Sequence, residues 1–132
     1  MKFSTKSTYG LRAMIILAKN YGQTVSLPSI SNSENISLSY LEGIFAKLKK
    51  AGLIEAEKGV SGGYRLGKKP VEINVFDIIQ AVEGGFAPFY CLSDKSKTFC
   101  KEGCSCSINS GFIMVQDEVR STLQKINLTR FI

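Results

Sequence analysis

Hydrophobic residues recur at helical spacing through the first 50 residues of the chain, and this pattern predicts three helices. The first covers residues 5–20, and a shorter second helix begins after Ser26 with a proline in its first turn. The third covers residues 37–50 and has the clearest apolar face, which consists of Leu38, Leu41, Ile44, Phe45 and Leu48.

Two short extended runs follow the third predicted helix and enclose a glycine-rich turn. The runs are residues 53–58 and 64–66, and the turn reads Gly59-Val60-Ser61-Gly62-Gly63. Extended runs on either side of glycines predict a β-hairpin. Three helices followed by a hairpin is the element order of a winged helix-turn-helix, a mainly α fold with a small β-hairpin. In that fold one helix enters the major groove of duplex DNA.

The second half of the chain predicts two more helices. One covers residues 74–85 and ends at a glycine pair. The other carries a long apolar stripe made of Ile108, Phe112, Val115, Val119, Leu123 and Ile126. A stripe of this length predicts a long C-terminal dimerisation helix that pairs with its twin in a homodimer, and packing against its own domain is the alternative. A two-fold symmetric dimer would bind a near-palindromic DNA operator.

The charge of the chain is divided unevenly between two parts. Residues 1–75 carry 11 lysines and arginines against 5 acidic residues, whereas residues 76–132 carry 6 of each, so the net charge of +6 lies in the first part. We therefore expect a winged helix-turn-helix DNA-binding domain over residues 1–75. Residues 76–132 would form a second region, with a cysteine-loop sensor and the dimerisation helix.

The composition narrows the possible functions. The chain has 132 residues and is 44% hydrophobic, which is enough for a globular core. It has no histidine, which excludes every catalytic triad, base or zinc site that needs imidazole, and it has no phosphate-binding loop. No apolar run reaches the roughly 20 residues that span a bilayer, and the N-terminus does not resemble an export signal. We expect a cytoplasmic protein that is not an enzyme and has no membrane partner.

Polar and basic residues of the third helix and the hairpin are the candidates for DNA contact. Ser39-x-x-Glu42 fits a helix capping box, but hydroxyls and a carboxylate in the first turn of such a helix can also contact bases, and Ser37 has the same two interpretations. Gly62 and Gly63 would allow a tight turn and a close approach to the sugar–phosphate backbone. Lys47, Lys49 and Lys50 form either a solvated helix face or phosphate contacts. The clearer candidates for phosphate contact are Lys2, Lys6, Lys58 and Arg65.

All four cysteines lie in one 16-residue window of the neutral part: Cys91, Cys100, Cys104 and Cys106. Their spacing differs from the paired C-x-x-C arrangement of structural zinc sites, and disulfides are disfavoured without an export signal. Clustered thiolates suit soft iron, and iron–sulfur clusters are held mainly by cysteine. The spacing alone favours a cluster and leaves zinc and thiol redox chemistry open.

Several strings of residues resemble the iron–sulfur cluster regulator (IscR-like) family of bacterial winged-helix transcription factors. They are ISLSYLE at residues 36–42, LKKAGLI at 48–54, KGVSGGYRL at 58–66 and AVEG at 81–84. The resemblance extends over roughly residues 1–128. It implies DNA contacts from the recognition helix and the hairpin, at Ser37, Ser39, Tyr40, Glu42, Ser61, Gly62, Gly63 and Tyr64.

The resemblance also bears on the cysteines. Cluster-binding members have three cysteines in this segment, the last two separated by five residues, and Cys91, Cys100 and Cys106 match this pattern. Their fourth ligand is a histidine three residues after the last cysteine, where this chain has Asn109. In the nitric-oxide-sensing branch it is a carboxylate near the N-terminus, where this chain has Thr8. The resemblance therefore implies an iron–sulfur cluster on Cys91, Cys100 and Cys106, with [2Fe–2S] favoured over [4Fe–4S]. Cys104 is an addition to the pattern and the obvious replacement for the fourth ligand, and a backbone atom, water or small thiol is the alternative.

Together these observations predict a dimeric transcriptional regulator whose DNA affinity is controlled by an iron–sulfur cluster. Its partners would be double-stranded DNA, a second copy of the chain, and either the cluster-assembly machinery or an enzyme of cysteine metabolism. The alternative within the same fold is a regulator without a cluster, controlled by a protein partner or by thiol oxidation. A small iron–sulfur electron carrier is a third possibility, against which the basic hairpin argues.

Overall fold

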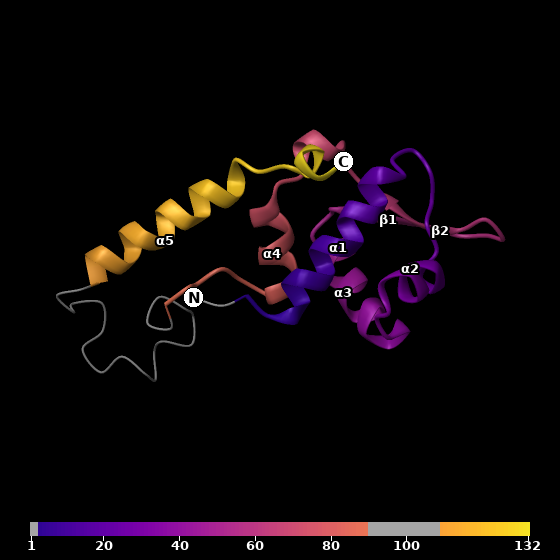
Figure 1. Ribbon diagram of the computed structural model, residues 1–132, viewed down its shortest axis with the longest axis horizontal. Helices are drawn as coiled ribbons and strands as arrows, with labels where there is room; N and C mark the ends of the chain where they lie inside the picture. Colours follow the sequence, from indigo (N-terminus) through magenta and orange to yellow (C-terminus); the bar gives the residue numbers. More distant parts are fainter. Residues whose placement is uncertain (1–2, 90–108) are drawn as a thin grey trace.

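The helices and strands occur in the order that the hydrophobic pattern predicts (Figure 1). The structure, a computed structural model, describes residues 3–89 and 109–132. Their elements are α1 Thr5–Lys19, α2 Leu27–Glu34, α3 Leu38–Lys50, β1 Ile54–Glu57, β2 Gly63–Leu66, the 3-10 helix η1 Pro70–Glu72, α4 Val75–Glu83, α5 Asn109–Gln124 and the 3-10 helix η5 Leu128–Phe131. The prediction of a mainly α fold with a small β-hairpin is confirmed.

Polar residues at the helix ends explain where the first three helices begin. Ser4, Ser26 and Ser37 each accept a hydrogen bond from a backbone N–H in the first turn of α1, α2 and α3, respectively. These bonds satisfy N–H groups that have no partner within the helix. Asn35 ends α2 in the left-handed conformation, with φ of 55°, and so turns the chain from α2 into α3.

The hairpin of β1 and β2, which we call the wing (residues 54–66), is antiparallel and pairs Ile54 with Leu66 at its base. These two side chains are buried beneath it. Val25, in the loop between α1 and α2, adds a β-bridge to Tyr64 through two backbone hydrogen bonds of 2.8 Å. A strand-like segment that the sequence pattern does not predict therefore joins the wing to the helices.

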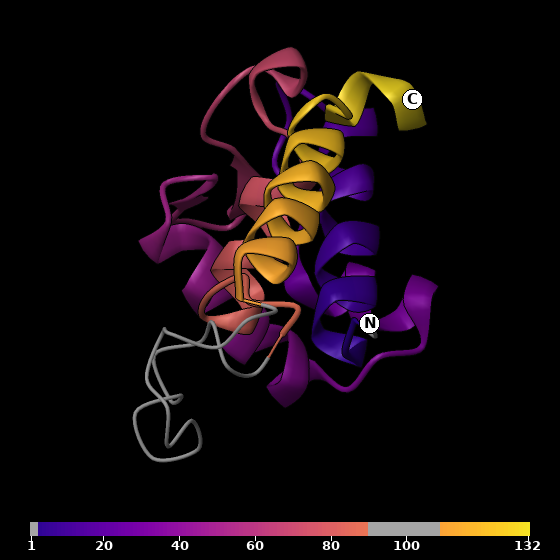
Figure 2. The ribbon, with the colours of Figure 1, turned by 90° about the vertical axis from the view of Figure 1, so that its left-hand side faces the viewer.

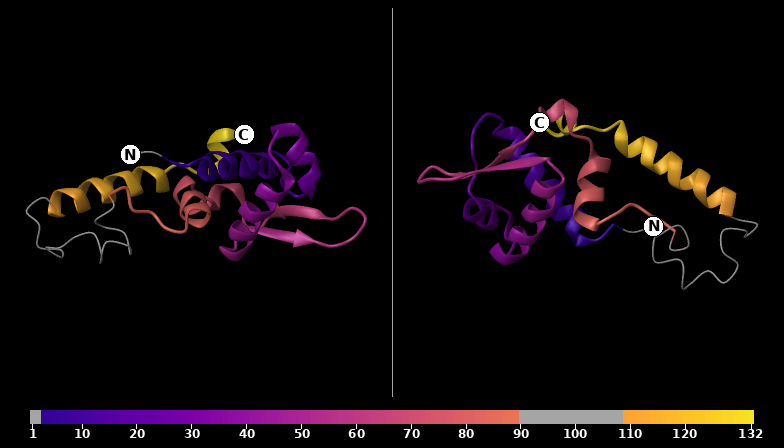
Figure 3. Two further views of the ribbon diagram at one scale, coloured as in Figure 1. Left: turned by 90° about the horizontal axis from the view of Figure 1, so that it is seen from below. Right: turned by 180° about the vertical axis from the view of Figure 1, so that it is seen from behind.

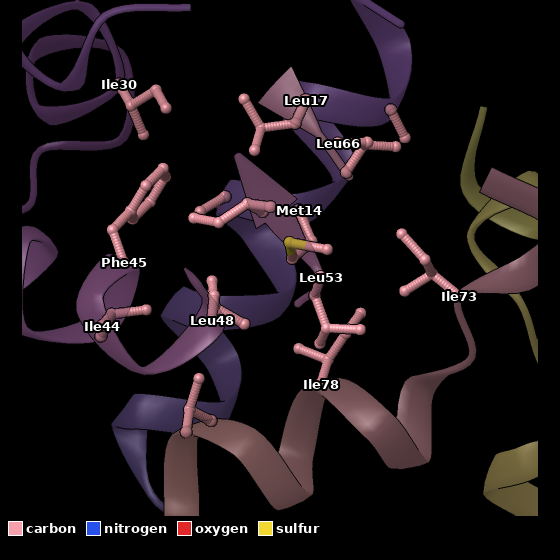
Figure 4. Packing of buried hydrophobic residues seen from close by; sticks show 14 of the residues in the cluster. Met14, Leu17, Ile30, Ile44, Phe45, Leu48, Leu53, Leu66, Ile73 and Ile78 are labelled. Atoms are coloured by element: carbon pink, nitrogen blue, oxygen red, sulfur yellow. The ribbon is translucent and has the colours of Figure 1, made fainter. Parts of the chain in front are cut away.

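A hydrophobic core lies between α1, α3 and α4, and α2 and the wing cover its edge (Figure 4). Met14 of α1, Phe45 of α3 and Ile78 of α4 are completely buried in it. Helices α1 and α4 approach each other closely, since a Cβ added to Gly10 would lie 3.0 Å from Val82 Cγ1. Helix α4 thus packs on helices of the predicted DNA-binding domain, residues 1–75. The division of the chain into a DNA-binding domain and a sensor and dimerisation region at residue 75 stays a prediction.

Helix α5 runs away from this core, as Figures 1 and 3 show from opposite sides, and Figure 2 views the molecule from the side on which α5 lies. The chain that follows α5 is attached to the residues around the start of α4. Val75 donates a backbone hydrogen bond of 2.8 Å to Ile126, and Leu128 donates one of 3.0 Å to Ile73. Among the helices in the described ranges, none has the length and apolar character needed to cross a membrane.

Candidate nucleic-acid interface

Helix α3 is amphipathic, and its packing turns the predicted base-contacting residues outward. Its buried residues are Leu41, Ile44, Phe45 and Leu48. Its exposed residues include Ser39, Glu42, Gly43 and Ala46, at the spacing that places side chains on one face of a helix. One side of α3 therefore packs on the core, and the other side faces solvent. Ser39 and Glu42 lie on this exposed side in the first turns of the helix, where a recognition helix contacts base edges.

Ser37 and Ser39 have different roles in the structure. The Ser37 hydroxyl accepts the backbone N–H of Tyr40 at 3.3 Å and caps α3. The predicted capping box of Ser39 with Glu42 is wrong, because Ser39 already lies inside the helix. The side chains of Ser39 and Glu42 are both exposed, which leaves their DNA-contact interpretation standing as a prediction.

Tyr40 is half-buried against α1. Its ring meets that of Tyr9 edge-on, with centroids 5.7 Å apart and planes at 90°. Its hydroxyl lies 3.3 Å from Thr5 Oγ1. Tyr40 therefore positions α3 on α1, a role that sequence reasoning does not assign to it.

A shallow groove between α1 and α3 carries two lysines, Lys6 and Lys47, at its rim. Lys6 is exposed. Lys47 donates a hydrogen bond of 3.3 Å from Nζ to the carbonyl oxygen of Val82, near the C-terminal end of α4. Carbonyls at that end lack partners within the helix and favour a nearby cation. Lys47 thus connects α3 to α4, and this contact distinguishes it from Lys49 and Lys50.

The wing glycines are required by close approaches within the protein itself. A Cβ added to Gly63 would lie 2.5 Å from the carbonyl oxygen of Val25, and one added to Gly62 would collide with the carbonyl oxygen of Glu57. The predicted close approach to DNA would be a second role for both. The backbone of Ser61 is held by the Thr24 hydroxyl, which donates to its carbonyl oxygen at 2.8 Å.

Tyr64 points toward the core rather than outward. Its ring meets Phe45 with centroids 4.8 Å apart and planes at 73°. Since Phe45 belongs to the buried face of α3, this contact fixes the wing relative to the recognition helix. Tyr64 therefore acts as a packing residue, and its contact with DNA stays a prediction.

The basic candidates differ in their surroundings. Lys49 and Lys58 are exposed, and within the described residues no ion pair joins either of them to a carboxylate. Arg65 is exposed as well, but it forms ion pairs with Glu55 and Glu57. Lys2 lies outside the described residues.

Glu83, the last residue of α4, is a polar connection that the sequence analysis missed. Its carboxylate accepts hydrogen bonds from the hydroxyls of Ser4 and Ser7, the latter at 2.6 Å. Burial raises the pKa of Glu83, but these hydroxyls, the backbone of Ser4 and the charge of Lys6 lower it by more, so the pKa lies below its ordinary value. The charged carboxylate joins α4 to the start of α1. The AVEG string contains this residue and is the sequence signal that could have drawn attention to it.

The apolar stripe of α5 is divided between two surroundings. Phe112 stacks on Phe89 with centroids 4.1 Å apart, and the guanidinium of Arg120 lies 5.5 Å from the ring centre of Phe76 on α4. Four residues of the stripe are half-buried, as is Arg120; they are Phe112, Val119, Leu123 and Ile126. Ile108 lies outside the described residues. Much of the stripe thus packs on its own chain, whereas the large apolar side chains that α5 exposes are Ile113, Met114 and Val115.

The predicted cluster ligands Cys91, Cys100, Cys104 and Cys106 lie outside the described residues. Within residues 3–89 and 109–132, no group of three side chains of the metal-binding types His, Cys, Asp and Glu comes together. The cluster site therefore rests on the sequence and on the resemblance.

An exposed polar helix face beside a β-hairpin, carried on three packed helices, defines a DNA-binding protein of the winged helix-turn-helix class. Residues 3–132 match the sequence profile of the Rrf2 family, which is described as "Iron-dependent Transcriptional regulator". The chain belongs to this family. It is a DNA-binding transcriptional regulator and not an enzyme.

Two of the transcriptional regulators to which the chain is similar are CymR and IscR. The chain is 45% identical over 96 residues to the transcriptional regulator CymR of Bacillus subtilis, covering 72% of this chain and 70% of CymR. The solved structure of that protein, "the Global Cysteine Regulator", matches with a TM-score of 0.77 at 36% identity, over 98% of this chain and 94% of the other.

The second name is IscR. The chain is 38% identical over 129 residues to IscR of Aliivibrio salmonicida, covering 97% of this chain and 75% of that protein. The solved structure of T. potens IscR matches with a TM-score of 0.73 at 35% identity, over 98% of this chain and 84% of the other. The chain is therefore a member of the Rrf2 family that is similar to regulators of both names, CymR and IscR.

Proposed function

We propose that the chain is a homodimeric regulator that binds a near-palindromic operator and whose DNA affinity is controlled by an iron–sulfur cluster. The observation that carries this proposal is that all four thiols lie in one segment between α4 and α5. A set of four thiolates suits an iron–sulfur cluster. The ligands would be Cys91, Cys100, Cys104 and Cys106, most simply around [2Fe–2S]. A cytoplasmic location is part of the same proposal.

DNA recognition is assigned to the exposed face of α3 and to the cations around it. Glu42 can accept a hydrogen bond from cytosine N4, and Ser39 can donate to or accept from several bases. Lys6, Lys49 and Lys58 would contact phosphates, which position the protein and make its affinity depend on salt.

Dimerisation is assigned to α5. Its exposed apolar residues Ile113, Met114 and Val115 have exposed fractions of 41%, 67% and 48%. Large apolar side chains grouped on a helix that extends from the core favour contact with another protein surface. A second copy of the chain, related by two-fold symmetry, would bring the same residues together and would match the symmetry of a near-palindromic operator.

Helix α4 is assigned the role of connecting the cysteine segment to the recognition helix. Its last two residues make contacts in both directions: the carbonyl of Val82 accepts from Lys47 of α3, and Glu83 accepts from Ser4 and Ser7 at the start of α1. When bound, a cluster supplies redox-sensitive bonds to the thiolates of the segment that follows α4. A shift at this end of α4 would change how α3 sits on α1, which would couple the segment to DNA affinity.

The second candidate is a regulator of the same fold without a cluster, controlled by a protein partner such as an enzyme of cysteine metabolism or by oxidation of its thiols. The observation that favours it is the likeness to the structure described as a global cysteine regulator, with a TM-score of 0.77 over 98% of this chain. In that case the four cysteines would serve as redox-active thiols or have no ligand role.

Anaerobic purification distinguishes the two candidates. Iron, acid-labile sulfide and the visible absorption spectrum are measured before and after reconstitution, for the wild type and for Cys104→Ser, with Ser105→Ala as the matched control. The proposal predicts a coloured wild type with about two irons per chain for a [2Fe–2S] cluster. It also predicts that Ser105→Ala retains the cluster and that Cys104→Ser loses it or holds it less stably. A colourless wild type without iron after reconstitution would contradict the proposal and favour the second candidate.

A further inference from the structure

The outer face of the wing carries an ion-pair group made of Glu55, Glu57 and Arg65. Arg65 Nη2 lies 3.3 Å from Glu55 Oε2, Arg65 Nη1 lies 3.8 Å from Glu57 Oε2, and Arg65 Nε also donates to Glu55 Oε2 at 3.3 Å. The pairing register places Glu55 directly opposite Arg65. All three side chains are about half exposed, at 56%, 54% and 48%, respectively.

The alternation of side chains along the strands explains why these charges share one face. Ile54, Ala56, Tyr64 and Leu66 alternate with them, and Ile54 and Leu66 are buried against the core. Glu55, Glu57 and Arg65 must therefore point to the solvent side. The two strands present two carboxylates against one guanidinium, so this face of the wing is not a basic surface. The nearest cation in sequence that forms no ion pair within the described residues is Lys58, at the tip.

We propose that Glu55 and Glu57 limit non-specific DNA binding by holding the Arg65 guanidinium on the hairpin and neutralising its charge. Sequence-independent affinity comes from cations that neutralise phosphates. A guanidinium flanked by two carboxylates cannot add to that affinity without first losing these partners. Phosphate contacts add to the binding of every duplex, so this restraint lowers the sequence-independent part of the affinity and leaves the base contacts from α3 unchanged.

The opposing interpretation is that the ion pairs only stabilise the hairpin. A cross-strand pair of opposite charges contributes modestly to a sheet. The two interpretations predict opposite signs. If the pairs are only structural, removing the carboxylates weakens DNA binding together with the wing. If they restrain Arg65, removing them strengthens binding to any duplex.

The test uses the full chain in four forms: wild type, Glu55→Gln/Glu57→Gln, Arg65→Gln, and the variant that combines all three substitutions. Binding to a labelled short duplex of random sequence is measured by fluorescence anisotropy over a series of salt concentrations. The same series is repeated with the tightest-binding duplex selected from a random-sequence pool. Thermal unfolding of each variant, at equal concentration, shows whether the fold is kept.

We expect Glu55→Gln/Glu57→Gln to bind the random duplex about 3- to 8-fold more tightly at 0.1 M salt, with a slope of log Kobs against log[salt] steeper by about 0.9, which is the effect of one additional phosphate contact. Binding to the selected duplex should rise by no more than this factor, so that the specificity ratio does not increase. Arg65→Gln alone should change binding by less than about 2-fold, and the triple variant should return to the wild-type slope.

Three results would overturn the proposal. If the triple variant keeps the tighter binding, the gain comes from lost negative charge in general and does not involve Arg65. If Arg65→Gln alone weakens binding, Arg65 contacts DNA in spite of its partners. If Glu55→Gln/Glu57→Gln weakens binding, the carboxylates only support the hairpin. All four forms are compared in the same cluster state, so the differences between them test the proposal whether or not the chain holds a cluster.

Discussion

Gly43 lies within α3 on the exposed face assigned to DNA, and its replacement by alanine should change stability and DNA affinity in opposite directions. Apart from its chain neighbours and the backbone of its own helix, no atom lies within 4 Å of a Cβ added at this position, so the substitution causes no clash inside the protein. Alanine is favoured over glycine in a helix interior by about 0.8–1.0 kcal/mol. We expect Gly43→Ala to raise the free energy of unfolding by about this amount. For a chain of this length the melting temperature should rise by about 3–5 °C.

The same methyl group would occupy space between the recognition helix and the major groove. Adding one methyl group to a closely packed contact costs about 1–3 kcal/mol, which corresponds to roughly 5- to 150-fold in affinity. Thermal unfolding at a fixed protein concentration measures the first effect. Anisotropy with a duplex selected from a random pool measures the second.

Gly111 provides the control, because it also lies in a helix, α5, and within the described residues a Cβ there would also have no atom within 4 Å apart from its chain neighbours and the backbone of its own helix. Gly111→Ala should not lower the stability and should leave DNA affinity unchanged. A Gly43→Ala variant that is more stable but binds DNA as the wild type does would refute the assignment of this face of α3 to DNA. A less stable Gly43→Ala would refute the packing argument.

Three further substitutions each test the role of one residue. Gly63→Ala would place a Cβ 2.5 Å from the carbonyl oxygen of Val25, so both the melting temperature and the DNA affinity should fall; unchanged values would show that the wing can shift freely. Because the pKa of Glu83 is lowered in the folded state, its stabilising effect is complete above the unfolded pKa of about 4.3 and is lost as the pH falls through the folded pKa. The difference in stability between wild type and Glu83→Gln, measured by urea unfolding, should therefore be constant near pH 7 and shrink below about pH 4.3, and a difference that does not change with pH would contradict this. Lys58→Gln should reduce the slope of log Kobs against log[salt] by about 0.9, whereas Lys125→Gln, directly after the end of α5, should leave this slope unchanged. Equal slopes for the two variants would show that Lys58 does not contact DNA.

The local structure of this chain was predictable because each element carries its own signals. Helix α3 has five apolar residues at helical spacing, four of which are buried, with a serine at its start and Gly52 after its end. The structure places Gly52 in the left-handed conformation, with φ of 75°. The hairpin was predictable from its glycines. The wrong capping box of Ser39 shows the limit of such signals. Two serines fit the start of α3, and in the structure Ser37 is the cap.

The contacts between distant residues were not predictable, because they depend on how the elements pack. Ser4 and Ser7 reach Glu83 across separations of 79 and 76 residues. Arg65 counts as a free cation in the sequence, and only the strand register places Glu55 opposite it. In α5 the periodicity revealed an apolar stripe. It could not reveal that residues such as Phe112 partly pack on the helix's own chain.

The central claim is that the state of the cysteine segment sets the affinity of α3 for DNA. The direct measurement compares one anaerobic preparation before and after removal of its iron, with the same selected duplex and at the same salt concentration. The proposed function predicts dissociation constants that differ by roughly 5- to 150-fold between the cluster-loaded and cluster-free forms. Equal dissociation constants for the two forms would contradict it.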